Sequence, residues 1–167
     1  MADGLVITGT VGAGKTSTLY QACELLVRAE VPHCALDVDA LWSGFPGWCD
    51  TEMSLRNVRA VWLNFRSVGA EKLLLADVVE TPEHAERFKV VCELDRIEVC
   101  RLRVDKEEVA RRLGNRDSGP RLDRHLARAV ELDALLEQAD IGDFVVDANG
   151  KDHLAVAREV LAAVGWL

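Results

Sequence analysis

The most constraining feature of the sequence is a glycine-rich segment close to the N-terminus. Residues 9–16 read Gly-Thr-Val-Gly-Ala-Gly-Lys-Thr and match the pattern G-x-x-x-x-G-K-[ST] at every fixed position. The segment follows a short apolar run, residues 5–8, and opens an amphipathic stretch, residues 15–29, which indicates a strand–loop–helix unit. Because glycines let successive backbone N–H groups turn inward, we expect this loop to bind phosphate groups.

The residue types in the loop suit different parts of a nucleoside triphosphate. Lys15 supplies a positive charge for the β- and γ-phosphates, and Thr16 supplies a hydroxyl ligand for Mg²⁺. The N-terminus of the following helix also favours an anion. We therefore predict that ATP or a close relative binds here with Mg²⁺. The predicted nucleotide-binding residues of this segment are Gly9, Thr10, Val11, Gly12, Ala13, Gly14, Lys15, Thr16 and Ser17.

The rest of the chain keeps alternating between strand and helix patterns. Amphipathic helix patterns separate four further apolar strand patterns, near residues 33–38, 72–79, 97–104 and 143–146. This alternation predicts a three-layer α/β fold, in which a five-stranded parallel sheet carries helices on both faces. A break over residues 114–120 predicts a short lid at about 112–121. The length of 167 residues and the absence of a linker predict one domain over residues 1–167.

Composition and charge narrow the class of protein further. Hydrophobic residues make up 49% of the chain and charged residues 29%, as in a globular protein with a core. No apolar run approaches the roughly 20 residues of a membrane-spanning helix, and the N-terminus lacks a secretory pattern, so we expect a cytoplasmic protein with no membrane partner. The net charge of −8 predicts no nucleic-acid partner, because an acidic surface repels phosphate backbones. The oligomeric state is left open.

Other classes of nucleotide-binding protein fit the sequence less well. A GTPase needs Asn-Lys-x-Asp to recognise guanine, whereas residues 149–152 read Asn-Gly-Lys-Asp. A motor or a helicase needs a longer chain than this one. A small-molecule kinase is the class that remains, and we expect it to prefer ATP over GTP.

The sequence resembles the small P-loop kinases, among them shikimate, gluconate and adenylylsulfate kinases and chloramphenicol phosphotransferase. The resemblance is carried by the loop at 9–16, by Leu-Asp-Val-Asp-Ala-Leu at 36–41, by Arg-Leu-Gly-Asn-Arg at 112–116 and by Val-Asp-Ala-Asn at 146–149. Together these segments span nearly the whole chain. The resemblance implies a P-loop NTPase fold and ATP-dependent transfer of the γ-phosphoryl group to a hydroxyl of a small molecule.

The resemblance also implies roles for individual side chains. Asp37 and Asp39 stand two apart on a strand, so both carboxylates can point to one side, beside the phosphate loop. By resemblance, Asp39 orients or deprotonates the acceptor hydroxyl and Asp37 supports Mg²⁺. Arg112 and Arg116 resemble lid arginines, one lying against adenine and the other meeting the transferring phosphoryl group. The predicted catalytic residues are Lys15, Asp39 and Arg116.

Two further positions have open alternatives. Asp77, near the end of the third strand pattern, either holds Mg²⁺ through water or is structural. Asn149 lies where these kinases pass the adenine edge, so we predict it as nucleotide-binding, although a turn alone would also explain it. Thr16 and Asp37 remain the predicted metal ligands.

The acceptor is not identified by the sequence. Its predicted pocket combines the irregular residues 41–50, which include Trp42, Phe45 and Trp48, with polar side chains further along the chain. Val-Glu-Thr at 79–81 replaces the Gly-Gly that shikimate kinase uses on its substrate, which argues against shikimate. A nucleotide or nucleoside kinase and a non-catalytic ATP-binding sensor are the alternatives. Besides Asp39, the predicted substrate-binding residues are Arg56, Asn57 and Glu80.

Overall fold

The strand patterns form one parallel sheet in the order β2-β3-β1-β4-β5. The structure is a computed structural model that describes residues 1–41 and 51–167. The first strand of the chain lies at the centre of the sheet, where Val6 pairs with Leu75 on one side and Val99 on the other. The strands are β1 (Asp3–Thr8), β2 (His33–Asp37), β3 (Lys72–Ala76), β4 (Arg96–Arg103) and β5 (Phe144–Asp147).

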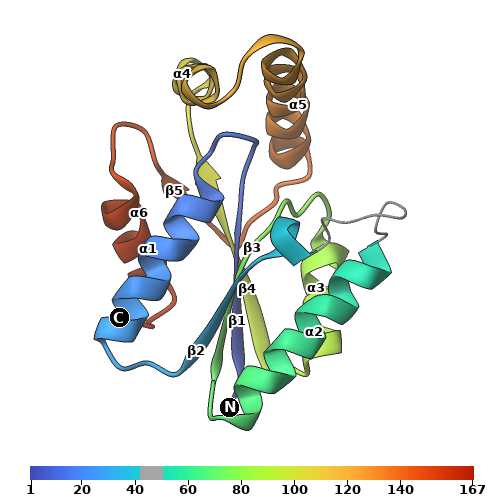
Figure 1. Cartoon of the computed structure of the whole chain (residues 1–167), viewed down its shortest axis with the longest axis vertical. Coiled ribbons are helices and arrows are strands. Elements are labelled where there is room, and N and C mark those ends of the chain that lie inside the picture. The colour runs from blue at the N-terminus through green and yellow to red at the C-terminus, as the bar shows by residue number, and fades with distance from the viewer. Residues whose placement is uncertain (42–50) are drawn as a thin grey trace.

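Helices cover both faces of this sheet, which confirms the predicted three-layer fold (Figure 1). One layer is formed by α1 and α6 and the other by α2 and α3, while α4 and α5 lie beyond the carboxyl ends of the strands (Figure 1). A short 3₁₀ helix, η1 (Val38–Leu41), follows β2 directly. The α-helices are α1 (Lys15–Arg28), α2 (Thr51–Ser67), α3 (Pro82–Cys92), α4 (Lys106–Arg116), α5 (Gly119–Gln138) and α6 (His153–Ala163).

Alternation along the strands divides the core into two halves. In β1, Leu5 and Ile7 belong to the cluster with α1 and α6, whereas Val6 belongs to the cluster with α2 and α3. All three are fully buried, as a strand covered on both faces requires. On the second face the buried indole of Trp62 in α2 donates from Nε1 to the carbonyl oxygen of Cys92 at 2.9 Å, which ties α2 to the end of α3.

The third strand and the fifth helix differ from the sequence prediction at ends that border the predicted site. The third strand ends at Ala76, whereas its apolar pattern continues to residue 79. Side chains take over the backbone hydrogen bonds there: Asp77 Oδ1 accepts from the Val78 N–H at 2.8 Å, and Thr8 Oγ1 accepts from the Val79 N–H at 2.9 Å. The fifth helix begins at Gly119, inside the predicted break, so the predicted lid spans the end of α4, a two-residue connection and the start of α5.

Among the described residues, no helix is both long and apolar enough to cross a membrane.

Candidate active site

The glycine-rich loop joins the central strand β1 to the N-terminus of α1. Gly12 and Gly14 have φ angles of 84° and 97°, a left-handed conformation that side chains disfavour. Space is also short, because a Cβ at Gly12 would lie 3.1 Å from the side chain of Leu113 in α4. The first turn of α1 then presents Thr16 and Ser17 to solvent. The loop thus has the backbone form that directs N–H groups at an anion.

Lys15 is held inside this loop by backbone oxygens. Its Nζ donates to the carbonyl oxygen of Gly9 at 3.0 Å and to that of Thr10 at 3.1 Å. Burial lowers the pKa of Lys15. Nearby carboxylates act in the opposite direction, and the guanidinium of Arg116 acts in the same direction as burial. Lys15 is therefore the charged centre on which groups from several elements act.

The carboxylates that act on Lys15 come from the ends of β2 and β3. They are Asp39, Asp77 and Asp37, in decreasing order of effect on its pKa. Asp37 Oδ1 accepts from the backbone N–H of Asp39 at 3.2 Å, so one predicted site residue helps to place the other. The parallel sheet brings these groups together because the carboxyl ends of β2, β3 and β1 share one edge.

Asp77 has a partner that sequence reasoning missed. The Nε2 atom of His84, in the first turn of α3, lies 3.2 Å from Asp77 Oδ2, and the imidazole stacks on Phe88 at a centroid distance of 5.4 Å. Asp77 is nearly buried and its Oδ1 is occupied by the backbone. A histidine seven residues after an aspartate carries no recognisable signal, because the loop between them decides whether they meet.

Arg112 joins the lid to the nucleotide loop. Its guanidinium donates from Nη1 to the carbonyl oxygen of Ala13 at 3.0 Å and from Nη2 to that of Ala148 at 3.1 Å. Within α4, Nε donates to Glu108 at 2.8 Å. The side chain therefore spans the loop and the connection after β5, which is the region predicted for the adenine.

Asn149 and the adjacent turn form the other wall of this region. Asn149 Oδ1 accepts from the backbone N–H of Asp105, the N-cap residue directly before α4, and its Nδ2 donates to Asp147. A Cβ at Gly14 would lie 2.8 Å from the ring of His153, the first residue of α6. His153 thus packs against the phosphate loop, a neighbour that the sequence prediction did not include.

Arg116 is anchored to a buried carboxylate at the junction of α4 and α5. Its Nη2 lies 2.9 Å from Asp117 Oδ2, and the same oxygen lies 2.7 Å from His125 Nδ1. Arg121 approaches the other carboxylate oxygen at 3.1 Å. Hydrogen bonds from Arg116 and then from His125 lower the pKa of Asp117 to about 2. This cluster was not predicted, since Asp117 looks like any loop aspartate in the sequence.

The predicted acceptor residues outside η1 have structural partners in the protein. Asn57 donates from Nδ2 to the carbonyl oxygen of Leu41 at 2.7 Å, which connects α2 to η1. Arg56 contacts the backbone oxygen of Glu52 within its own helix. Glu80 forms an ion pair with Arg128 of α5. Their roles toward an acceptor stay predictions, while Trp42, Phe45 and Trp48 lie outside the described residues.

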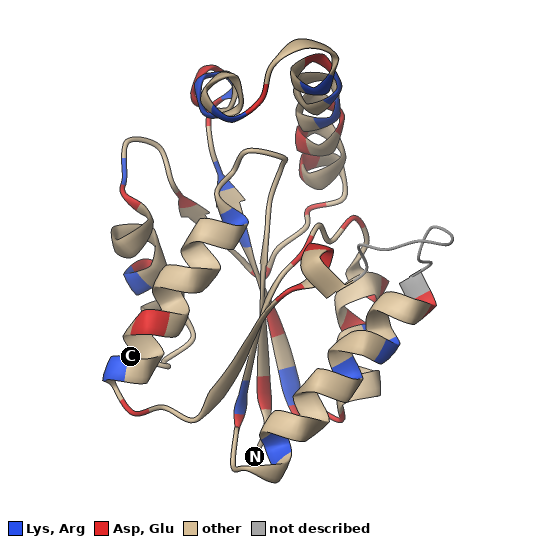
Figure 2. Ribbon diagram, viewed as in Figure 1, with Lys and Arg blue, Asp and Glu red and all other residues tan. Residues whose placement is uncertain are grey.

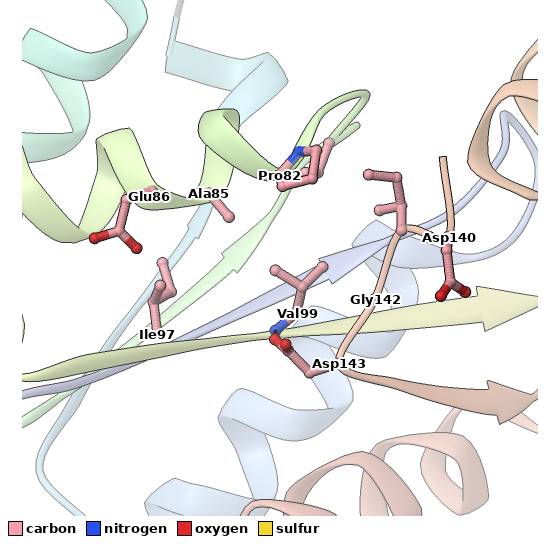
Figure 3. A pocket seen from close by; sticks show the side chains of 10 residues that line it. Pro82, Ala85, Glu86, Ile97, Val99, Asp140, Gly142 and Asp143 are labelled. Carbon is pink, nitrogen blue, oxygen red and sulfur yellow. Dashed lines mark hydrogen bonds between the residues drawn. The ribbon is translucent and has the colours of Figure 1, made fainter. Parts of the chain in front are cut away.

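A separate cavity of about 200 Å³ lies between α3, β4 and the connection from α5 to β5 (Figure 3). Val79, Ile97 and Val99 give it an apolar floor. Glu86, Asp140 and Asp143 are the charged residues that line it. This cavity includes no residue of the phosphate loop, and its acidic lining does not suit a phosphate group.

The donor set beside Lys15 fits Mg²⁺. Within residues 1–41 and 51–167, no three His, Cys, Asp or Glu side chains converge closely enough to form a metal cage. Mg²⁺ in nucleotide sites keeps several waters and takes only one or two carboxylates in addition to phosphate oxygens. The exposed hydroxyl of Thr16 and the carboxylate of Asp37 or Asp77 are oxygen donors of that kind.

The fold and the loop together define a class: the chain has the three-layer α/β fold of the small P-loop kinases. The tunicamycin resistance protein of Deinococcus radiodurans superposes with a TM-score of 0.67 at 18% identity, over 99% of this chain and 96% of that one. The APS kinase of Mycobacterium tuberculosis, in complex with AMPPNP and APS, superposes with a TM-score of 0.64 at 18% identity over 98% of both chains.

Shikimate kinase of Acinetobacter baumannii, in complex with shikimate, is similar at a TM-score of 0.60 and 17% identity, over 98% of this chain and 93% of that one. No protein-family model and no curated protein matches the sequence, so the likeness is one of fold. The resemblance drawn from four short segments of sequence is thereby confirmed at the level of structure.

Proposed function

We propose that the protein is an ATP-dependent phosphotransferase that moves the γ-phosphoryl group of ATP to a hydroxyl of a small molecule. The observation that carries the proposal is that three carboxylates from the region where β2 and β3 end raise the pKa of Lys15 across the shared edge of the sheet. A phosphate loop alone would serve a nucleotide-binding protein of any kind. Carboxylates beside the γ-phosphate position are what an acceptor hydroxyl requires.

Each side chain in the proposal has a distinct part. Lys15 holds the β- and γ-phosphates, and Arg116 neutralises charge on the group in transfer. Asp39 accepts a hydrogen bond from the acceptor hydroxyl, aligns it for attack and takes up its proton. Such chemistry depends mainly on positioning and on fixed charges, so a few groups suffice. Mg²⁺, held by Thr16 and Asp37 with Asp77 close by, would supply charge neutralisation between the phosphates.

In this proposal Arg116 is the lid residue that changes its partner during the reaction. Arg116 is half exposed and turned toward Asp117, yet its charge already acts on Lys15. In the proposed reaction the Arg116 guanidinium would exchange this carboxylate for phosphate oxygens of the group in transfer. Arg112 meanwhile links α4 to the loop through its hydrogen bond to the carbonyl oxygen of Ala13.

The test is substitution of Asp39 by asparagine, which keeps the size of the side chain and removes its negative charge. Phosphoryl transfer should fall by about 10²–10⁴-fold, the usual contribution of a general base, while the Kd for ATP stays unchanged. Single-turnover assays with a panel of hydroxyl compounds, read by mass spectrometry, measure this. Asp123→Asn, on the exposed surface of α5, is the matched control.

Two outcomes would contradict the proposal. Wild-type protein that binds ATP but phosphorylates nothing across a broad acceptor panel would instead support a nucleotide sensor. Wild-type transfer rates in Asp39→Asn would show that the acceptor does not lie beside this carboxylate.

A further inference from the structure

We propose that the acceptor is a neutral or cationic hydroxyl compound, and that carboxylates and phosphate esters are excluded. This inference rests on the proposed function. Residues 37–41 and 77–81 begin at or directly after the ends of β2 and β3, on the side of the sheet where the phosphate loop lies, and are called the acceptor edge below. The charge of the acceptor depends on the balance between the fixed carboxylates of this edge and the lysines and arginines near it.

The acceptor edge is rich in carboxylates. Asp37, Asp39 and Asp77 all raise the pKa of Lys15 by their negative charge. Glu80 lies in the same connection as Asp77, between β3 and α3. Figure 2 shows acidic residues on η1 and on the connections next to it, at the carboxyl end of the sheet. His84, beside Asp77, is the basic neighbour that α3 contributes.

The Lys and Arg side chains of α2 and α3 are engaged elsewhere. In α2, Arg59 pairs with Glu93 at 3.3 Å, and the guanidinium of Arg66 lies over the ring of Trp62 at 5.6 Å. Arg56 contacts a backbone oxygen of its own helix. In α3, Arg87 pairs with Glu52 and Lys89 pairs with Glu86. These five residues are all the lysines and arginines of the two helices that flank the acceptor edge.

The connection between β2 and α2 cannot add a cation. The sequence contains neither lysine nor arginine between Arg28 and Arg56. The stretch does contain further acidic residues, Asp50 and Glu52.

Arg128 of α5 reaches the acceptor edge, and its charge is matched by carboxylates. It pairs with Glu80 through Nη2 and with Glu131 through Nη1 at 3.4 Å. An anionic acceptor would have to displace Glu80 from this pair. It would also enter beside the three aspartates and the γ-phosphate, where like charges oppose binding. A hydroxyl compound with no charge, or with an amine, meets no such opposition.

The experiment measures acceptor charge preference without turnover. Protein saturated with Mg²⁺ and AMPPNP, a non-hydrolysable ATP analogue, is titrated with three matched sugars and followed by saturation-transfer NMR. The probes are glucose, glucosamine and glucuronate, which are neutral, cationic and anionic. We expect glucosamine to bind at least about tenfold more tightly than glucuronate, because like charges suppress the wrong partner. The ratio should shrink between about 0.02 M and about 1 M salt, since salt screens exposed charges.

Glu80→Gln and Glu131→Gln form a matched pair of variants. Both remove one carboxylate from Arg128, but only Glu80 belongs to the acceptor edge. Glu80→Gln should reduce the glucosamine-to-glucuronate ratio several-fold by freeing Arg128 for an anion, and Glu131→Gln should leave the ratio unchanged. The inference would be overturned if glucuronate bound the wild type as tightly as glucosamine does. It would also be overturned if neither sugar bound.

Failure of this inference and failure of the proposed function are distinguishable. Because AMPPNP does not react, the charge preference is measured even if the protein transfers no phosphoryl group. Preferential phosphorylation of anionic acceptors would overturn the charge argument and leave the phosphotransferase proposal standing. A preference for glucosamine over glucuronate without transfer to any hydroxyl compound would support the charge inference and contradict the phosphotransferase proposal.

Discussion

Replacing Lys15 by methionine should weaken ATP binding without weakening the fold. Methionine keeps the apolar stem of the side chain and removes only the ammonium group. That group is held by the carbonyl oxygens of Gly9 and Thr10 before any ligand arrives. Burial lowers the pKa of Lys15, so the protonated form is disfavoured in the folded protein. Removing the charge should therefore not lower the melting temperature.

The expected loss of affinity follows from the hydrogen bonds exchanged. A hydrogen bond to a charged group contributes about 1.5–3 kcal/mol, so two phosphate contacts contribute about 3–6 kcal/mol. The ammonium group gives up its two bonds to loop carbonyls, at about 1 kcal/mol each. The net loss in the variant is about 1–4 kcal/mol. Its middle value, about 2.5 kcal/mol, corresponds to a roughly 70-fold higher Kd.

Calorimetry with ATP and Mg²⁺ measures this change, and thermal unfolding reports on the fold. Lys89→Met is the matched control, because Lys89 lies on α3 and pairs with Glu86 of the same helix at 3.1 Å. The control should bind ATP like the wild type. A folded Lys15→Met variant with wild-type affinity would refute the assignment of the phosphate site. A variant that no longer folds would refute the view that burial opposes this charge.

Three other predictions concern two residues of the lid, Asp117 and Arg112, and the preference for adenine over guanine. Hydrogen bonds from Arg116 and then His125 hold the pKa of Asp117 at about 2, below its ordinary 3.8, so its stabilising contribution is present above about pH 4 and lost as the pH falls toward 2. Urea unfolding from pH 7 to 2 should show Asp117→Asn less stable at neutral pH and equal to the wild type near pH 2; a constant difference would contradict this. Arg112→Ala should raise the Kd for ATP roughly tenfold by losing two charged hydrogen bonds, one linking α4 to the nucleotide loop and one linking it to the connection after β5, and calorimetry that finds no change would disprove it. ATP should outcompete GTP at least about tenfold, because discrimination needs base-specific hydrogen bonds and Asn-Lys-x-Asp is absent; a competition assay favouring GTP would contradict the prediction.

Much of the fold could be predicted because its signals are local. The phosphate loop is contiguous, and its glycines adopt the left-handed angles that the motif requires. The apolar runs that became strands are read from neighbouring residues, and alternation with helices leaves a parallel sheet as the consistent arrangement. Element ends were less predictable. The strand pattern at 72–79 stops early because Asp77 and Thr8, from different elements, accept the next backbone hydrogen bonds.

In the candidate site, too, some positions could be predicted from sequence and others could not. The placement of Asp37 beside the loop follows from sequence, because it ends a strand whose neighbours are fixed by the fold. Asp39, predicted on the same strand, lies instead in η1, because the chain turns into a 3₁₀ helix directly after Asp37. The partners of Glu80 and Asp77 do not follow from sequence. Arg128 is 48 residues from Glu80 in the chain, and His84 meets Asp77 through the turn that α3 makes.

The sequence by itself determined the phosphate loop, the order of strands and helices, and the absence of lysine and arginine between Arg28 and Arg56. These are properties of composition and short-range pattern, which need no knowledge of long-range contacts. Only the tertiary structure decided which charges are already matched: Arg116 by buried Asp117, and Arg128 by Glu80. Charge pairing depends on distances of a few ångströms between elements, and packing of α4 and α5 over the sheet edge sets those distances.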